Sequence, residues 1–328
     1  MAKAESKTRQ GWIEFDRLVA LRDIGSSPWS SGSMPELKFK PEFDLLEELL
    51  AVPIRLGLGT TSGMPAKAVD VWIAHELRRA GFLPDEVWPR ASTPRVLPRE
   101  VALLRDLDGM RAISDDLFGR IDRGLVGKGV TGADAKILGK AYEKQVDVVI
   151  AQWARGPELM ISTKRMDSSF GNNALNRIEE SYGDAKNLRG RHPLAATGFL
   201  FVLRSTAFDS QKDTALRLMD LIVKLAKEPD AYDATSVIVV EWQQPESGAV
   251  VAAELDDGKP LNVAVKVRHD LIPETLRPDR FLAAMVNAVI DRTPINLHEE
   301  VRTRRGQEVP AEEGVTGAYD QESDDTAD

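Results

Sequence analysis

An acid and a base lie at the ends of two neighbouring apolar runs. Asp147 stands early in the run 145–152, Lys164 ends the run 157–164, and a Gly-Pro break separates them. Both runs are rich in β-branched residues, so the pattern predicts two antiparallel strands in a hairpin. Side chains alternate between faces along a strand, so Ser162 and Lys164 share a face. We therefore expect Asp147 and Lys164 to converge at one sheet edge, although a structural ion pair explains the same spacing.

A helix predicted at 173–188 supplies a second acid. At about 100° per residue, its apolar residues form a stripe along one face. The stripe consists of Leu175, Ile178, Tyr182 and Ala185. Glu179 flanks this stripe, whereas Glu180 lies near the opposite face. If the stripe packs on the sheet, Glu179 is held close to Asp147.

Two carboxylates beside a lysine suit a hard divalent cation. Carboxylate and backbone carbonyl oxygens are the ligands that Mg²⁺ prefers, so we expect Asp147, Glu179 and the Thr163 carbonyl to bind Mg²⁺, with Mn²⁺ as a substitute. Such an ion polarises a phosphate and activates water. Lys164 would orient that water and offset the charge that develops on the phosphoryl oxygens. The candidate chemistry is phosphodiester hydrolysis.

These residues resemble the motif of the PD-(D/E)XK nucleases, which share the restriction-endonuclease-like fold. The family pattern is an acid in a helix, an Asp in the first strand and an acid-x-Lys in the second. Here the matching residues are Glu143, Asp147 and Ser162-Thr163-Lys164. The position before Asp147 is Val146, where the motif's name has Pro.

Ser162 stands where the family commonly has an acid. One group of type II restriction enzymes is similar in having Ser-x-Lys followed by a displaced Glu in the next helix, which Glu179 or Glu180 would supply here. The resemblance implies a Mg²⁺-dependent endonuclease that cuts double-stranded DNA, of restriction or phage-defence type. Two alternatives remain open: a catalytically inactive DNA-binding protein of the same fold, and a different enzyme whose acids fall in this pattern by chance.

Polar and basic residues after the lysine are candidates for DNA contacts. Arginine, serine and asparagine side chains commonly bind phosphates or base edges. The candidates are Arg165, Ser168, Ser169, Asn172, Asn173, Arg177, Arg189 and Arg191. Helix capping explains one of the two asparagines equally well, and a helix dipole explains the two arginines after the helix.

Composition fits a globular protein that binds DNA locally. The chain has 328 residues, no cysteine and a formal charge of −9, but the segment 308–328 holds eight acids and no Lys or Arg. Residues 155–204 contain eight Lys or Arg against five acids. The four histidines show no zinc-ligand spacing, and no apolar run is long enough for a bilayer or a secretion signal. We expect a cytoplasmic protein, and a homodimer, because cutting two strands favours two active sites.

Apolar periodicity predicts an α/β (α+β) protein in three parts. Residues 1–130 are expected to be mainly helical, with 1–40 loosely ordered, helices at 41–52, 59–82 and 98–121, and a glycine-rich connector at 123–132. Residues 131–305 form the nuclease-like core, with helices at 133–143, 173–188, 210–229 and 277–293 and strands at 145–152, 157–164, 197–205, 234–242, 249–255 and 262–270. The acidic tail 306–328 is expected to be disordered. The N-terminal region is a candidate for DNA recognition or dimerisation.

Overall fold

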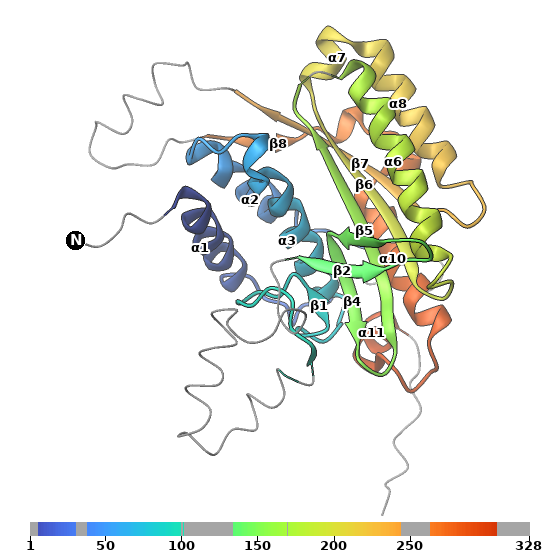
Figure 1. Cartoon of the computed structure of the whole chain (residues 1–328). Helices are drawn as coiled ribbons and strands as arrows, with labels where there is room; N and C mark the ends of the chain where they lie inside the picture. The colour runs from blue at the N-terminus through green and yellow to red at the C-terminus, as the bar shows by residue number, and fades with distance from the viewer. Residues whose placement is uncertain are drawn as a thin grey trace, which may run out of the picture.

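The computed structural model describes residues 6–30, 38–99, 101, 134–168, 170–243 and 263–306. They form a six-stranded mixed sheet with helices on both faces and a separate two-stranded hairpin (Figure 1). The predicted α/β class, with a mixed sheet flanked by helices, is confirmed. No helix in these ranges is long and apolar enough to span a membrane.

The main sheet has the strand order β1-β4-β5-β6-β7-β8. Its strands are β1 (Val87–Trp88), β4 (Val148–Gln152), β5 (Gly156–Met166), β6 (Ala196–Arg204), β7 (Ala234–Trp242) and β8 (Val265–Val267). β5, β6 and β7 run parallel, and the other neighbouring pairs are antiparallel. β6 and β7 are buried over almost their whole length, as expected for parallel strands covered on both faces.

The N-terminal helices lie on one side of this sheet: the second and third pack on its strands, and the first packs on those two helices (Figure 1). They are α1 (Lys7–Ala20), α2 (Phe43–Arg55) and α3 (Met64–Arg79), with the short turn η1 (Thr60–Ser62) before α3. The expectation that residues 1–40 are loosely ordered is wrong for α1. The Ser6 hydroxyl accepts a hydrogen bond from the Arg9 amide at 3.3 Å, and Phe15 is fully buried. A capped helix with one apolar stripe is ordered by packing, despite its polar composition.

The later helices complete both layers. α6 (Gly171–Arg189) and α8 (Lys212–Leu225), with α7 (Thr206–Ser210) between them in sequence, cover the face opposite α3 (Figure 1). After the turns η2 (His269–Leu271) and η3 (Glu274–Leu276), α10 (Pro278–Arg292) packs on β6 and β7 beside α3, and α11 (Glu299–Arg304) follows. Gly198 allows this close approach, because a Cβ there would lie 2.8 Å from the Phe281 ring.

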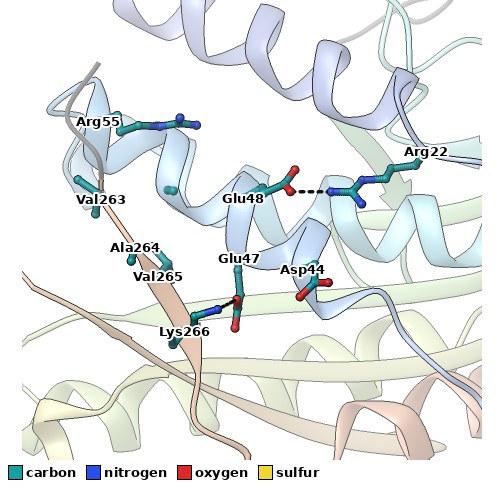
Figure 2. A pocket seen from close by; sticks show the side chains of 10 residues that line it. Arg22, Asp44, Glu47, Glu48, Arg55, Val263, Ala264, Val265 and Lys266 are labelled. Carbon is teal, nitrogen blue, oxygen red and sulfur yellow. Dashed lines mark hydrogen bonds and ion pairs between the residues drawn. The ribbon is translucent and has the colours of Figure 1, made fainter. Parts of the chain in front are cut away.

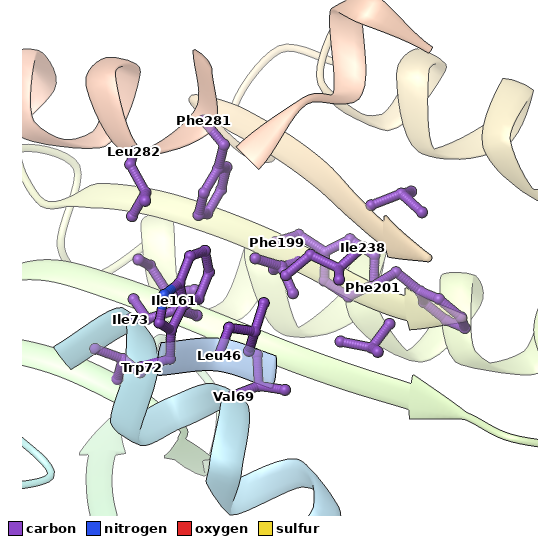
Figure 3. Close-up of a cluster of buried hydrophobic side chains, with 14 of the residues drawn as sticks. Leu46, Val69, Trp72, Ile73, Ile161, Phe199, Phe201, Ile238, Phe281 and Leu282 are labelled. Atoms are coloured by element: carbon purple, nitrogen blue, oxygen red, sulfur yellow. The ribbon is translucent and has the colours of Figure 1, made fainter. Parts of the chain in front are cut away.

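The N-terminal helices and the sheet share one hydrophobic core. In Figure 3, Trp72 of α3 and Leu46 of α2 lie close to Ile161 of β5, and Phe281 of α10 approaches from above. In addition, β1 comes from the N-terminal third and pairs with β4. In the described ranges, residues 1–130 are therefore integral to the α/β body and do not form a separate core.

The segment 133–143, predicted as a helix, forms a hairpin instead. β2 (Ala135–Leu138) pairs antiparallel with β3 (Glu143–Val146). Asn187 of α6 fixes the turn: its Oδ1 accepts hydrogen bonds from the Ala141 and Tyr142 amides at 2.8 and 3.2 Å, and its Nδ2 donates to the Tyr142 carbonyl at 2.9 Å. A Cβ at Gly139 would lie 2.2 Å from Asn187 Nδ2, so only glycine fits there. Tertiary contacts thus override a weak local helix preference.

Most other predicted elements are present with shifted ends. The predicted helix 210–229 is present as the shorter α8, with α7 directly before it, and the predicted strand 262–270 is reduced to β8. The predicted strand 249–255, the connector 123–132, most of the helix 98–121 and almost all of the acidic tail lie outside the described residues.

Candidate functional site

The site lies where the pairing between β4 and β5, the two strands of the predicted hairpin, ends. β4 pairs with β5 up to Val148↔Ile161, whereas the residues before Asp147 turn away to pair with β2. Beyond Ile161, β5 has no neighbouring strand on this side within the described ranges. Asp147 takes that place, and its Oδ2 accepts a hydrogen bond from the Thr163 amide at 2.8 Å. In an antiparallel ladder the amide and carbonyl of one residue point the same way, so the Thr163 carbonyl also faces this gap.

A second acid, Asp70, reaches the same residue from α3. The Thr163 hydroxyl donates a hydrogen bond to Asp70 Oδ1 at 2.7 Å, so one residue holds both carboxylates. The Asp70 side chain is only 1% exposed. Burial, together with the nearby Asp147 carboxylate, raises the pKa of Asp70 well above its usual range. Burial also raises the pKa of Asp147, although the Thr163 amide and the surrounding lysines oppose this effect.

Lys67, one helical turn before Asp70 in α3, places a positive charge next to this pair of acids. Its Nζ lies 3.3 Å from Asp70 Oδ2 and 3.0 Å from Asp134 Oδ1. Burial alone would lower the pKa of Lys67, but the charges of Asp70, Asp134 and Asp147 outweigh it and raise the pKa. The ammonium is therefore a permanent positive charge beside the two carboxylates.

Lys164 and Glu180 approach from the opposite face of the sheet. Lys164 Nζ lies 3.5 Å from Glu180 Oε1, which Lys144 also contacts at 3.3 Å, and Arg177 binds Glu180 Oε2 at 3.1 Å. Burial alone would raise the pKa of Glu180, but Lys164 and Arg177 more than offset it, so the pKa is lowered. Lys164 also contributes to the positive field at Asp147.

The predicted facing of α6 is wrong. Glu179 is exposed and makes no ion pair with any described residue, whereas Glu180 contacts Lys164. Tyr182 is 38% exposed, and Ser181 is buried in its place. The Ser181 hydroxyl donates to the Arg177 carbonyl at 2.6 Å, which lets a polar residue occupy the packed face. The packed face therefore keeps Ala185 and Ile178 of the predicted stripe but has Ser181 in place of Tyr182.

Ser162 and Glu143 do not supply acids to the site. Ser162 is buried on the α6 side near Tyr232, whose hydroxyl donates to the Ser181 carbonyl at 2.8 Å. Glu143 lies on β3 rather than a helix and pairs on the surface with Lys136 at 3.7 Å. The assignment of Glu143 to a helical acid position is therefore wrong.

The predicted DNA-contacting residues divide into a group that is held by ion pairs inside the fold and an exposed group, in which Arg177 binds Glu180. Arg165 is buried and binds Asp167 at 2.8 Å, and Arg189 binds Asp233 at 3.0 Å, so both have structural partners. Arg177 and Arg191 are exposed, as is Ser168. Ser169 lies outside the described residues, as do the side chains of Asn172 and Asn173.

A cleft of about 500 Å³ adjoins Lys164 at the end of β5. Its walls come from η1, from the β5–α6 connection and from the first turns of α6. They consist of Thr60, Arg165, Met166, Asp167, Ser168, Asn176, Arg177 and Glu180. Glu180 links the cleft to Lys164, because it lines the cleft and lies 3.5 Å from the Lys164 ammonium.

A second cleft, of about 420 Å³, lies elsewhere between α2 and β8 (Figure 2). Four of its charged groups form two ion pairs: Glu48 binds Arg22 at 2.7 Å, and Glu47 binds Lys266 at 2.8 Å. Glu47 Oε1 also accepts a hydrogen bond from the Val267 amide at 2.9 Å. This cleft shares no residue with the Asp147 site.

The residues at Asp147 fit one hard cation in part. Asp70 and Asp147 converge on Thr163, and Asp70 Oδ2 is a buried oxygen without a hydrogen-bond partner. Within the described ranges, however, no three His, Asp or Glu side chains gather as a ready metal centre. A cation here would bind two carboxylates and the Thr163 carbonyl, with water completing its coordination.

Asp70, Lys67 and Asp134 were not expected from the sequence. The available signal was an acid at position 70 inside the apolar stripe of a helix, next to Val69 and Trp72. A buried carboxylate is costly unless it is paired or functional.

Comparison with protein-family models, with curated proteins and with solved structures finds no match for this chain. The resemblance to PD-(D/E)XK nucleases therefore depends on the motif residues alone.

Proposed function

We propose that this protein is a Mg²⁺-dependent DNA endonuclease of restriction or phage-defence type. The observation that carries the proposal is the pair of buried carboxylates, Asp70 and Asp147, held by Thr163, with Lys164 of the same strand acting electrostatically on Asp147. Burying two acids together destabilises a fold unless a cation or a proton compensates. Acids in such surroundings occur at catalytic sites more often than on ordinary surfaces.

Each residue has a distinct task in this proposal. Bound Mg²⁺ would neutralise phosphate charge and activate water, and Asp70, Asp147 and the Thr163 carbonyl would hold it. Lys164 would orient the attacking water and stabilise the charge on the phosphoryl oxygens. Glu180 keeps the Lys164 ammonium in place from the α6 side. Arg177 and Ser168, which line the adjoining cleft, would bind the neighbouring phosphates.

The second candidate is a DNA-binding protein of this fold that does not cut. Ser162 favours it, because this side chain is buried near Tyr232 and leaves the site without the acid that precedes the lysine in most of the family. In this candidate the same cleft would bind DNA, and the bound DNA would stay uncut whether or not divalent cations are present.

Incubation with mixed-sequence plasmid DNA, with and without Mg²⁺, tests the proposal. We expect nicked and linear products only with Mg²⁺, and none from Lys164→Ala, which should keep the wild-type circular dichroism spectrum. Lys224→Ala is the control, because Lys224 pairs with Asp220 on the exposed face of α8. DNA binding without cleavage under all cation conditions would favour the second candidate, and a Lys164→Ala variant as active as wild type would contradict the catalytic assignment.

A further inference from the structure

We propose that Lys67 is a built-in counter-cation that competes with the divalent metal for the Asp70–Asp147 pair, and that it moves to Asp134 when the metal binds. The inference rests on the proposed cation at this pair. It assigns to Lys67 a task that differs from catalysis: control of metal affinity.

The position of Lys67 is the first argument. Its Nζ lies 3.3 Å from Asp70 Oδ2, the carboxylate oxygen that has no hydrogen-bond partner. This is the oxygen that a metal at the pair would need. The ammonium and a metal ion would repel each other at such short range, so both cannot occupy this position.

The balance of charge is the second argument. Asp70 is 1% exposed, and it lies within the electrostatic reach of Asp147. A cation or a proton must therefore compensate this pair when no metal is bound. Lys67 supplies one, because its charge acts on both Asp70 and Asp147.

A second partner for the ammonium is the third argument. Asp134, at the start of the β2–β3 hairpin, already binds Lys67 Nζ at 3.0 Å and is 35% exposed. Lys67 itself retains 22% exposure, so its flexible stem ends at the boundary between the buried pair and solvent. The ammonium can leave Asp70 and stay paired with Asp134. The free-energy cost of displacing it is therefore small.

Manganese titration without DNA tests this proposal by isothermal calorimetry. Lys67→Met removes the charge and keeps the length of the side chain, and it should bind MnCl₂ on the order of tenfold more tightly than wild type. Lys67→Arg keeps the charge and should stay within about twofold of wild type. Lys224→Met is the matched control from an exposed Lys–Asp pair, and its Mn²⁺ affinity should not change.

The gain in Lys67→Met must depend on the acid pair, so the double variant Lys67→Met/Asp70→Asn should lose it. Equal or weaker Mn²⁺ binding by Lys67→Met, or an equal gain in Lys67→Arg, would overturn the proposal. If Lys67→Met does not fold, Lys67→Gln replaces it. Failure of both neutral variants to fold also overturns the proposal, because a lysine that the fold cannot lose cannot be displaced.

The outcome for Lys67 is separable from the outcome for the nuclease. A gain in Mn²⁺ affinity that needs Asp70, combined with no DNA cleavage by wild type, retains the counter-cation and removes the endonuclease. Mg²⁺-dependent cleavage by wild type, without a gain in Mn²⁺ affinity in Lys67→Met, retains the endonuclease and removes the counter-cation.

Discussion

At the scale of single residues, the site is defined by the two carboxylates that hydrogen-bond to Thr163. Its amide binds Asp147 and its hydroxyl binds Asp70, so the two carboxylates are placed by one residue of β5. Alternation along the strand sends Thr163 toward α3 and Lys164 toward α6. The site is thus built from both faces of the sheet, at the point where the chain passes from β3, which pairs with β2, to β4, which pairs with β5.

Replacing either buried acid should remove activity. Asp147→Asn and Asp70→Asn keep the shape of the side chain but remove its charge, so each should reduce Mg²⁺-dependent plasmid cleavage by about 100-fold. The control is Asp220→Asn, an exposed acid on α8. The measurement is the initial rate of nicking at saturating Mg²⁺. A fully active Asp70→Asn variant would exclude this acid from the site.

Glu180 should matter more than Glu179. Glu180→Ala removes the carboxylate that pairs with Lys164, Lys144 and Arg177, and should slow cleavage by about tenfold through a misplaced ammonium. Glu179→Ala should stay close to wild type, because that side chain is exposed. Comparing the two cleavage rates checks the facing of α6. The opposite order would restore the facing expected from the apolar stripe.

At the scale of elements, the β2–β3 hairpin depends on one side chain. Asn187 is buried, and its amide group satisfies two backbone amides and one carbonyl of the turn. Asn187→Ala removes these three hydrogen bonds and should lower the free energy of unfolding by about 1–3 kcal/mol. Urea unfolding measures the change, with Asn296→Ala, at an exposed position, as the control. A loss no larger than that of the control would mean that the turn is fixed by other contacts.

A second contact between elements, the ion pairs of Asp233, makes the stability of the fold depend on pH. Asp233, just before β7, binds Arg292 of α10 and Arg189 of α6 and accepts the Thr197 amide of β6 at 2.8 Å. Burial alone would raise its pKa, but the hydrogen bonds from Arg292, the Thr197 amide and Arg189 outweigh it and lower the pKa to about 2.

Because the folded pKa lies below the usual value near 4, ionised Asp233 stabilises the fold above that value. The contribution is lost as the pH falls from about 4 to about 2. Allowing for solvent screening, it amounts to about 1–2 kcal/mol. Asp233→Asn should be less stable at pH 7 and should lose less stability over this range. Urea midpoints between pH 7 and pH 2 measure the effect, and parallel curves for both proteins would contradict it.

At the scale of the whole molecule, the proposal requires two sites for one duplex. Each chain has one Asp147 site, so cleavage of both strands favours a symmetric pair of chains on a palindromic target. We expect static light scattering to give the mass of a dimer with DNA bound. A monomer mass both free and on DNA would remove the dimer but leave single-strand nicking possible.

The parts of the structure that follow from local patterns were predictable. The β4–β5 hairpin and the shared face of Ser162 and Lys164 come from the alternation of side chains, and β7 matches the predicted strand 234–242. The contribution of Asp70 was not predictable in this way. It is 93 residues from Thr163 in sequence, and only the packing of α3 on the sheet brings them together.

Two other errors have specific physical causes. The facing of α6 was missed because Ser181 looks polar in the sequence but satisfies its hydroxyl within the helix. The hairpin at 135–146 was missed because its turn is stabilised by Asn187, which follows it by more than 40 residues. In each case the structure depends on a hydrogen bond of a polar side chain, and the spacing of apolar residues does not predict such a bond.

The contact between Glu47 and β8 has a consequence for self-association. Among the described residues β8 is an outer strand of the sheet, and such strands offer free amides and carbonyls to the edges of other chains. Glu47 of α2 occupies the outward amide of Val267, and Lys266 places a charge beside it. A carboxylate thus takes the position where an incoming strand would begin its ladder. This edge is protected against aggregation by a side chain from the other end of the sequence, and Glu47→Ala would expose it.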